Sequence, residues 1–328
     1  MLKDKESVLV TGGCGFIGSA FVRKAVKKYR VIVVDKLTYA GDKKRLEIVE
    51  GKYKFYKEDI CNRKRMEKIF KKERPQILIN FAAQTHVDRS IKNPLPFIET
   101  NVKGTQILAD LALKFKIKKF VQISTDEVYG ETKKGEFKET HSLNPSSPYS
   151  ASKASADLLI KSYIRTYKLP AIIIRPSNCY GPWQYPEKLI PLAILKLLKN
   201  EKVPVYGDGK NVREWLYVED CVEAILKILK KGKIGEIYNV GSGEERKNID
   251  VVRKIIKILG KSESLIEFVS DRPGHDFRYR LNSKKIYEEI DFKPKVKFEE
   301  GLKKTVNWYI KHKKWLLDKG VSCSGEDA

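Results

Sequence analysis

Two short segments of this sequence carry side chains that can move protons. Ser124-Thr-Asp-Glu127 follows an apolar run, and Tyr149 precedes Lys153 by four residues. Residues four apart share one face of a helix, so an ammonium group and a phenol can meet there. The lysine charge would lower the pKa of the phenol from about 10 and let it take a proton from a hydroxyl group. On an ordinary helix such a pair is usually exposed to solvent and has no catalytic role. Beside a cofactor site, the same pair indicates catalysis.

The adjacent carboxyl groups of Asp126 and Glu127 allow two interpretations. In a solvated turn they would cap the following helix. In a cleft they could divide the roles of acid and base, if their surroundings separated their pKa values. The spacing alone favours neither interpretation.

A glycine-rich turn after the first apolar run supplies the cofactor site. In Gly12-Gly-Cys-Gly15-Phe-Ile-Gly18, the first glycine permits a tight turn, Gly15 lets the backbone approach a pyrophosphate, and Gly18 lets helix pack on strand. The helix that follows would direct its N-terminus at the phosphates. A glycine turn needed only for packing is the alternative, and the strand, helix and acid in register argue against it.

An acidic residue ends the second apolar run. Asp35 can bind the ribose hydroxyls and would repel a 2′-phosphate, so NAD is favoured over NADP, although Lys36 beside it could assist a phosphate. Asp59-Ile60 after the third predicted strand could reach the adenine. Ala82-Ala83 after the fourth predicted strand would let the backbone lie near the cofactor. These positions are evidence for a cofactor site only in combination, because each alone is common after a strand.

Apolar runs alternate with amphipathic stretches, which predicts an α/β, Rossmann-type doubly wound parallel sheet with right-handed crossovers. We expect residues 1–176 to form the NAD-binding domain, with about 207–240 returning to it. Residues 177–321 would form mainly a smaller α/β lobe that binds substrate, and residues 322–328 a flexible tail. The expected strands are Ser7–Thr11, Val31–Val34, Lys54–Tyr56, Gln76–Asn80, Lys119–Ser124, Ala171–Arg175 and Trp215–Val218. The expected helices are Phe16–Tyr29, Pro96–Lys116, Tyr149–Tyr167, Leu189–Lys199, Asp220–Lys230, Ile249–Leu259 and Phe298–Lys314.

The composition excludes several classes of protein. The formal charge of +24 comes from 66 Lys and Arg against 42 Asp and Glu, spread along all 328 residues. Without a basic tail or interleaved aromatics, this pattern favours a solvated lysine-rich surface over a nucleic-acid groove. No apolar run is long enough to span a membrane. Five cysteines and four histidines without ligand spacing predict no metal, and reduced thiols are typical of a cytoplasmic protein.

Longer motifs identify a family. They are Thr11–Ser19, Asp35–Gly41, His86–Ile91, Ser124–Gly130, Pro186–Pro191, Gly207–Arg213 and Asp271–Asp276. Over nearly its whole length the chain resembles the extended short-chain dehydrogenase/reductase family, also called the NAD-dependent epimerase/dehydratase family. Within it, the Thr-Asp-Glu triplet resembles that of the 4,6-dehydratases of nucleoside-diphosphate glucose, with dTDP-glucose the expected substrate.

This resemblance implies a role for each catalytic residue. Tyr149, helped by Lys153 and Thr125, would take part in oxidising C4 of the glucose. Glu127 would then remove the C5 proton, and Asp126 would protonate the departing C6 hydroxyl. The hydride would return to C6, so NAD would stay tightly bound and be recycled. The 4-keto-6-deoxy product would feed rhamnose or related sugar synthesis.

The resemblance also assigns binding residues. Asn178 and Arg213 would hold the diphosphate. The full cofactor set is Gly12, Gly15, Phe16, Ile17, Gly18, Asp35, Lys36, Thr38, Asp59, Ile60, Ala82, Ala83, Thr100, Tyr149, Lys153 and Asn178. The full substrate set is His86, Thr125, Asn178, Lys188, Leu189, Pro204, Tyr206, Arg213, Asn248, Arg272 and His275. A homodimer through a four-helix bundle would use 96–116 and 149–167 of each chain.

The chain departs from the family at two places. Arg45 stands before Leu46 where the family usually has asparagine, and Cys179 follows Asn178 where a second asparagine is common. Three other functions remain open: a nucleotide-sugar 4-epimerase, a 4,6-dehydratase for another nucleotide, and a non-catalytic NAD- or RNA-binding protein.

Overall fold

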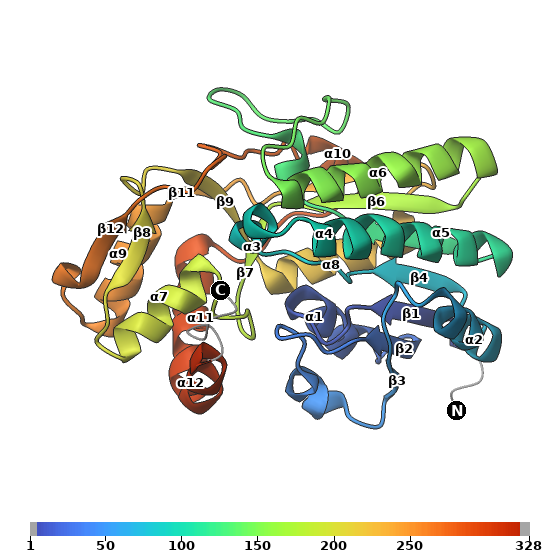
Figure 1. Cartoon of the computed structure of the whole chain (residues 1–328), viewed down its shortest axis with the longest axis horizontal. Helices are drawn as coiled ribbons and strands as arrows, with labels where there is room; N and C mark the ends of the chain where they lie inside the picture. Colours follow the sequence, from blue (N-terminus) through green and yellow to red (C-terminus); the bar gives the residue numbers. More distant parts are fainter. Residues whose placement is uncertain (1–4, 322–328) are drawn as a thin grey trace.

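The computed structural model of the protein describes residues 5–321, in which a smaller lobe lies beside a large lobe built on a parallel sheet (Figure 1). The sheet forms where apolar residues run without interruption. Val31–Val34 are buried on both faces of the sheet, as expected for a parallel sheet covered by helices on each side.

The large sheet has seven parallel strands in the order β10-β6-β5-β4-β1-β2-β3. Strand β1 pairs with β2 on one side and β4 on the other, so the direction of chain progression reverses at β1. Ligands of such sheets bind outside the carboxyl ends of the strands at this reversal. The strands are β1 (Ser7–Thr11), β2 (Arg30–Asp35), β3 (Tyr53–Lys57), β4 (Ile77–Asn80), β5 (Lys119–Ile123), β6 (Ala171–Pro176) and β10 (Ile237–Val240).

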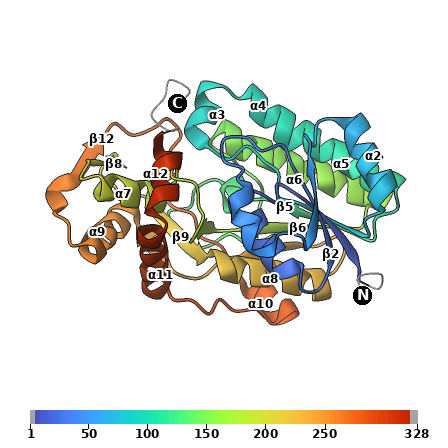
Figure 2. The same ribbon diagram turned by 90° about the horizontal axis from the view of Figure 1, so that it is seen from below.

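Successive side chains of the strands point to opposite faces, which gives the sheet two cores. Val8 packs with helices on one face, and Leu9 packs with helices on the other. The first face is covered by α1 (Phe16–Ala25), α8 (Val218–Lys231) and α10 (Lys284–Ile290), and the second by α2 (Arg63–Glu73), α5 (Gly104–Lys114) and α6 (Pro148–Tyr167). Figure 2 shows the two helix layers on either side of the strands. The predicted doubly wound Rossmann-type fold is confirmed.

The segment predicted as one helix, Pro96–Lys116, is divided by a π-helical turn. Its parts are α4 (Leu95–Phe97), the π-helix η2 (Ile98–Lys103) and α5, preceded by α3 (Val87–Lys92). Buried Asn101 in η2 accepts a hydrogen bond from the Gln84 backbone at 2.8 Å and donates one to Ser152 Oγ at 2.8 Å. The widened turn thereby ties the loop after β4 to helix α6.

The smaller lobe has its own apolar core around α7, α9 and α11. Its sheets are β11-β9-β7 and the pair β12-β8. Its strands are β7 (Asn178–Tyr180), β8 (Val203–Tyr206), β9 (Val212–Tyr217), β11 (Glu245–Lys247) and β12 (Ile266–Val269). Its helices are α7 (Leu189–Leu198), α9 (Asn248–Leu259), η4 (Glu263–Leu265), α11 (Phe298–Lys311) and α12 (Lys313–Val321). The predicted helix Phe298–Lys314 is divided because His312 leaves helical geometry at φ −110°, ψ 33°.

The region expected to return to the large lobe, about 207–240, is divided between the two lobes at the start of α8 (Val218–Lys231). Strand β10 pairs with β6 and helix α8 packs on α1, whereas β9 belongs to the smaller lobe. Helix α10 also packs on β10 and α8, which was not predicted. The predicted tail, 322–328, lies outside the described residues.

Candidate active site

The glycine loop joins β1 to α1 in a conformation that excludes larger residues. Gly12 has φ +66°, and a Cβ there would lie 2.6 Å from the backbone nitrogen of Ala82. A Cβ on Gly18 would lie 2.2 Å from the carbonyl oxygen of Gly12. Gly15 is the N-cap of α1 and offers no capping side chain, so the first backbone N–H groups of the helix stay available to an anion.

The carboxylate of Asp35 is fixed at the end of β2. It accepts hydrogen bonds from the backbone nitrogens of Cys14 at 2.9 Å and Leu37 at 2.8 Å, and burial raises its pKa. Lys36 forms an ion pair with Asp59 at 3.1 Å, so its charge is already balanced within the protein. This pairing leaves Lys36 poorly suited to receive a 2′-phosphate.

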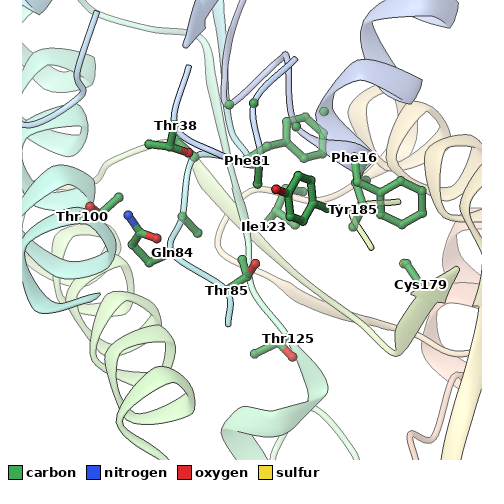
Figure 3. A pocket seen from close by; sticks show the side chains of 18 of the residues that line it. Phe16, Thr38, Phe81, Gln84, Thr85, Thr100, Ile123, Thr125, Cys179 and Tyr185 are labelled. Carbon is green, nitrogen blue, oxygen red and sulfur yellow. The ribbon is translucent and has the colours of Figure 1, made fainter. Parts of the chain in front are cut away.

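Every residue predicted to bind the cofactor lines one cavity of about 310 Å³. The residues predicted to be catalytic, Thr125, Asp126 and Glu127, line the same cavity, together with Lys188 of the predicted substrate set. Figure 3 shows part of this lining, with Gln84 and Thr100 on one side and Cys179 on the opposite side. The sheet reversal thus brings the glycine loop and the residues predicted to transfer protons to one cavity.

Thr125, and not either acid, caps the short helix η3 (Asp126–Tyr129). Its Oγ1 accepts a hydrogen bond from the Glu127 backbone at 3.2 Å and donates one to Asp126 Oδ1 at 3.1 Å. Asp126 Oδ2 is buried without a hydrogen-bond partner. Neither acid therefore caps η3, and Asp126 keeps one carboxyl oxygen without a hydrogen-bond partner.

The two carboxyl groups lie in different electrostatic surroundings. Burial, and then the charge of Glu127, raise the pKa of Asp126 well above its usual value. Burial also raises the pKa of Glu127, but the charges of Lys188, Arg272 and Arg213 oppose the rise. Asp126 is therefore the better proton donor and Glu127 the better proton acceptor.

Helix α6 begins just before the predicted tyrosine. Ser147 and Ser150 form a reciprocal capping box, and the backbone nitrogen of Tyr149 donates to Ser90 Oγ at 3.1 Å. Both Tyr149 and Lys153 are buried and line the cavity. Lys153 Nζ donates to the Ile123 carbonyl at 2.6 Å.

The predicted effect of Lys153 on the phenol is wrong for the protein without cofactor. Burial and the negative charge of Glu127 raise the pKa of Tyr149 well above its usual value, and a hydrogen bond with Thr125 opposes them. Burial in turn lowers the pKa of Lys153 to about 8. Desolvation is the largest cause of both shifts, so in the cofactor-free protein burial favours the neutral form of each group.

The remaining substrate residues do not line this cavity. A neighbouring cluster gathers around Asp88 of α3, which contacts Tyr206 at 3.4 Å, Arg272 at 3.5 Å and His86 at 3.8 Å. The ring of His275 packs edge-on against Tyr206. The cluster joins the two lobes beside the cavity.

Arg213, Leu189, Pro204 and Asn248 lie in the smaller lobe outside the cavity lining. Arg213 bonds the carbonyls of Val212, Phe277 and Asp276, and its charge acts on Glu127. Leu189 begins α7, Pro204 lies in β8, and Asn248 begins α9 with its side-chain oxygen unpartnered.

Several cavity residues were missed by the sequence interpretation. Gln84, Thr85, Gln184, Tyr185 and Glu187 all line the cavity. The last three follow Trp183 in an irregular segment between β7 and α7, where no periodicity predicts which side chains point inward. Two of them, Gln184 and Glu187, have a buried side-chain oxygen without a hydrogen-bond partner.

No helix in the described part of the chain is long and apolar enough to cross a membrane. Residues 5–321 also hold no grouping of His, Cys, Asp and Glu suited to a metal ion.

The chain is similar to characterised nucleotide-sugar enzymes over almost its whole length. A family model described as GDP-mannose 4,6 dehydratase matches residues 9–305. A dTDP-glucose 4,6-dehydratase from Escherichia coli is 45% identical, with 94% of each chain covered. The chain therefore belongs to this family of extended short-chain dehydrogenases/reductases, as the motifs predicted.

Solved structures agree with the family. DesIV, a dTDP-glucose 4,6-dehydratase from Streptomyces venezuelae with NAD bound, has a TM-score of 0.92 at 42% identity, covering 94% of this chain and 98% of that one. UDP-glucose 4-epimerase from Thermotoga maritima has a TM-score of 0.88 at 34% identity, covering 93% and 99%. The predicted class, an NAD-dependent nucleotide-sugar dehydratase, is confirmed.

Proposed function

We propose that this protein converts dTDP-glucose to the nucleotide-linked 4-keto-6-deoxyglucose by transient oxidation at C4. The observation that carries the proposal is the meeting of Tyr149 and Lys153 with Asp126 and Glu127 in the cavity that the glycine loop opens. An oxidoreductase needs only the first pair. The second pair adds the acid and base that removal of water requires.

The residues at the loop fit NAD. The N–H groups at the start of α1 suit a diphosphate, and Asp35 at the end of β2 suits ribose hydroxyls. When bound, NAD would supply a reversible carrier for the hydride that leaves C4 and is returned to C6. Because the cofactor ends each turnover as it began, the protein needs no added oxidant.

The side chains of this chain move the protons. Tyr149 takes the proton of the C4 hydroxyl, while Lys153 and Thr125 hold the phenol in place. The resulting C4 ketone acidifies the C5 hydrogen, which Glu127 removes as a proton and gives back to C5 once hydride has reached C6. Asp126, kept protonated by its burial, gives its proton to the C6 hydroxyl as water leaves.

Cationic side chains suit the charged part of the substrate. Lys188 lines the cavity, and the charges of Arg213 and Arg272 act on Glu127. A diphosphate held by these residues would bring the sugar to Tyr149. The nucleoside would then lie toward Tyr206 and His275, in the cluster around Asp88.

The protein acts as a homodimer in the cytoplasm under this proposal. Leu95, Ile98 and Leu158, on α4, η2 and α6, are 59%, 52% and 53% exposed. These elements pack side by side along one face of the large lobe (Figure 1), so a second copy could cover their apolar side chains in a four-helix arrangement. The free cysteines of the described chain, Cys14, Cys61, Cys179 and Cys221, fit a reducing compartment, where the product would enter synthesis of rhamnose or a related deoxysugar.

Incubation with a panel of glucose nucleotides tests the proposal. With dTDP-glucose and no added cofactor, we expect the base-sensitive chromophore of a 4-keto sugar. Formation of the galactose epimer without a chromophore would identify a 4-epimerase instead. Faster turnover of another glucose nucleotide would change the assigned substrate but not the class of reaction. Salt-sensitive RNA binding without turnover would overturn the proposal.

A further inference from the structure

Arg45 is a buried cation in the wall of the cavity. It lies in the short helix η1 (Lys43–Val49), and only 1% of it is exposed. No carboxylate within residues 5–321 lies within 4.0 Å of its guanidinium nitrogens. Burying an unpaired charge is costly, so this arrangement calls for a compensating anion.

The guanidinium is held by three backbone carbonyls. Nη1 donates to Cys14 at 2.7 Å and to Ala40 at 2.5 Å, and Nε donates to Trp183 at 3.0 Å. Cys14 belongs to the glycine loop, Ala40 to the loop after Asp35, and Trp183 to the smaller lobe. One side chain therefore joins the three segments that surround the cofactor cavity.

The remaining nitrogen, Nη2, is buried without a hydrogen-bond partner. The ring of Trp315 lies 5.6 Å from the guanidinium carbon, and Trp315 Nε1 donates to Asp42 at 3.0 Å. Asp42 also pairs with Lys319 of α12 at 3.1 Å, so this carboxylate already has a cationic partner. The charges of Asp42 and Asp35 act on Arg45, but neither carboxylate forms an ion pair with it, and Nη2 keeps its donors unused.

We infer that Arg45 supplies a counter-charge for the diphosphate of the bound dinucleotide. The inference rests on dinucleotide binding at the proposed site and not on dehydration of a sugar. The glycine loop that receives a diphosphate is the loop whose Cys14 carbonyl Arg45 already holds. An arginine is suited to this role because it stays charged when buried and offers several donors.

The test compares ligands that differ only in phosphate. Full-length Arg45→Met, Arg45→Lys and wild-type proteins are titrated with ADP and with adenosine by calorimetry, and the NAD retained per chain after gel filtration is measured. We expect Arg45→Met to lose most of its retained NAD. Its affinity for ADP should fall at least tenfold, while its affinity for adenosine changes less than about twofold. Arg45→Lys should recover most of the affinity for ADP.

Glu73→Gln is the matched control. Glu73 is a buried charge of the same lobe that pairs with Arg30 and Lys54, and it does not line the cavity. It should lower the melting temperature while leaving the ratio of ADP to adenosine affinity unchanged. If Arg45→Met does not fold, Arg45→Gln replaces it, because glutamine keeps a donor for the carbonyls but removes the charge.

Two results would overturn the inference. Equal weakening of ADP and adenosine binding would show that Arg45 only supports the loops. Unchanged binding of ADP in the uncharged variant would show that the diphosphate does not interact with Arg45. Because binding alone is measured, a protein that fails to dehydrate dTDP-glucose can still confirm the role of Arg45.

Discussion

Lys153 Nζ donates a hydrogen bond to the backbone carbonyl of Ile123 at 2.6 Å. This contact fastens helix α6 to the carboxyl end of β5, the strand that leads into Thr125, Asp126 and Glu127. Segments separated by 30 residues in the chain therefore meet at one edge of the sheet. Their meeting allows one site to oxidise a sugar and to remove water from it.

Tyr149→Phe should abolish oxidation at C4. The phenylalanine keeps the packing of the ring against Phe97 but cannot accept the hydroxyl proton. We expect the rate of cofactor reduction, followed by absorbance after rapid mixing with dTDP-glucose, to fall by about 10²–10⁴-fold. Tyr163→Phe, on the same helix but outside the cavity lining, should react at the wild-type rate. Normal cofactor reduction in Tyr149→Phe would remove this residue from the mechanism.

Glu127→Gln should permit oxidation at C4 but slow the loss of water by about 10²–10⁴-fold, because the amide cannot take the C5 proton. Reduced cofactor should accumulate. In deuterated water, Asp126→Asn should still exchange the C5 hydrogen, since it retains Glu127, whereas Glu127→Gln should not. Exchange in Glu127→Gln at the wild-type rate would assign the base to another residue.

Lys153→Met should stabilise the cofactor-free protein at neutral pH while it destroys activity. Burial lowers the pKa of Lys153 from 10.5 to about 8, which corresponds to roughly 3 kcal/mol. Between these two values the unfolded chain binds more protons than the native one, so this group makes stability rise with pH; below about pH 8 the cost of burial is fully present.

We therefore expect the free energy of unfolding of Lys153→Met to exceed that of the wild type by roughly 1–3 kcal/mol at pH 7. The advantage should shrink toward zero near pH 10. Denaturant unfolding at both pH values, with cofactor removed, provides the measurement. A variant less stable than the wild type at pH 7 would mean that the bond to Ile123 outweighs the cost of burying the ammonium group.

Leu158→Lys should disrupt the proposed dimer. Leu158 is exposed on α6, and a charge there would have to be buried between two copies of the chain. Sedimentation should show a monomer or a dissociation constant raised at least about tenfold. Phe268→Lys replaces an apolar side chain that is 57% exposed on β12 of the other lobe and should leave the assembly unchanged. If Leu158→Lys and the wild type sediment as assemblies of the same mass, the dimer interface lies elsewhere.

The large lobe could be predicted from local pattern because its strands are fully apolar and its glycine loop admits few conformations. Ser7–Thr11 was predicted at the same bounds that the structure gives. The π-helical turn around Asn101 could not be predicted, since it depends on partners in the loop after β4 and in α6. The short strands β7, β8 and β11 have three or four residues and owe their form to pairing across the smaller lobe.

The residues of the site could be predicted where the residue type itself provides the chemistry. Properties that depend on tertiary contacts could not be predicted. Tyr149, Lys153, Asp126 and Glu127 could be named from spacing and motif. The raised pKa of Tyr149 could not, because it comes from burial and from a charge 22 residues earlier in the chain. The contacts of Arg45 likewise depend on Trp183, which only the folded lobes bring near.

The most direct test of the central claim follows one hydrogen through the reaction. The protein, as purified and without added cofactor, is given dTDP-glucose deuterated at C4, and the product is examined by mass spectrometry and NMR. We expect a product lighter by one water, with the deuterium retained at C6. A product of unchanged mass, or one that has lost the deuterium to solvent, would contradict the claim.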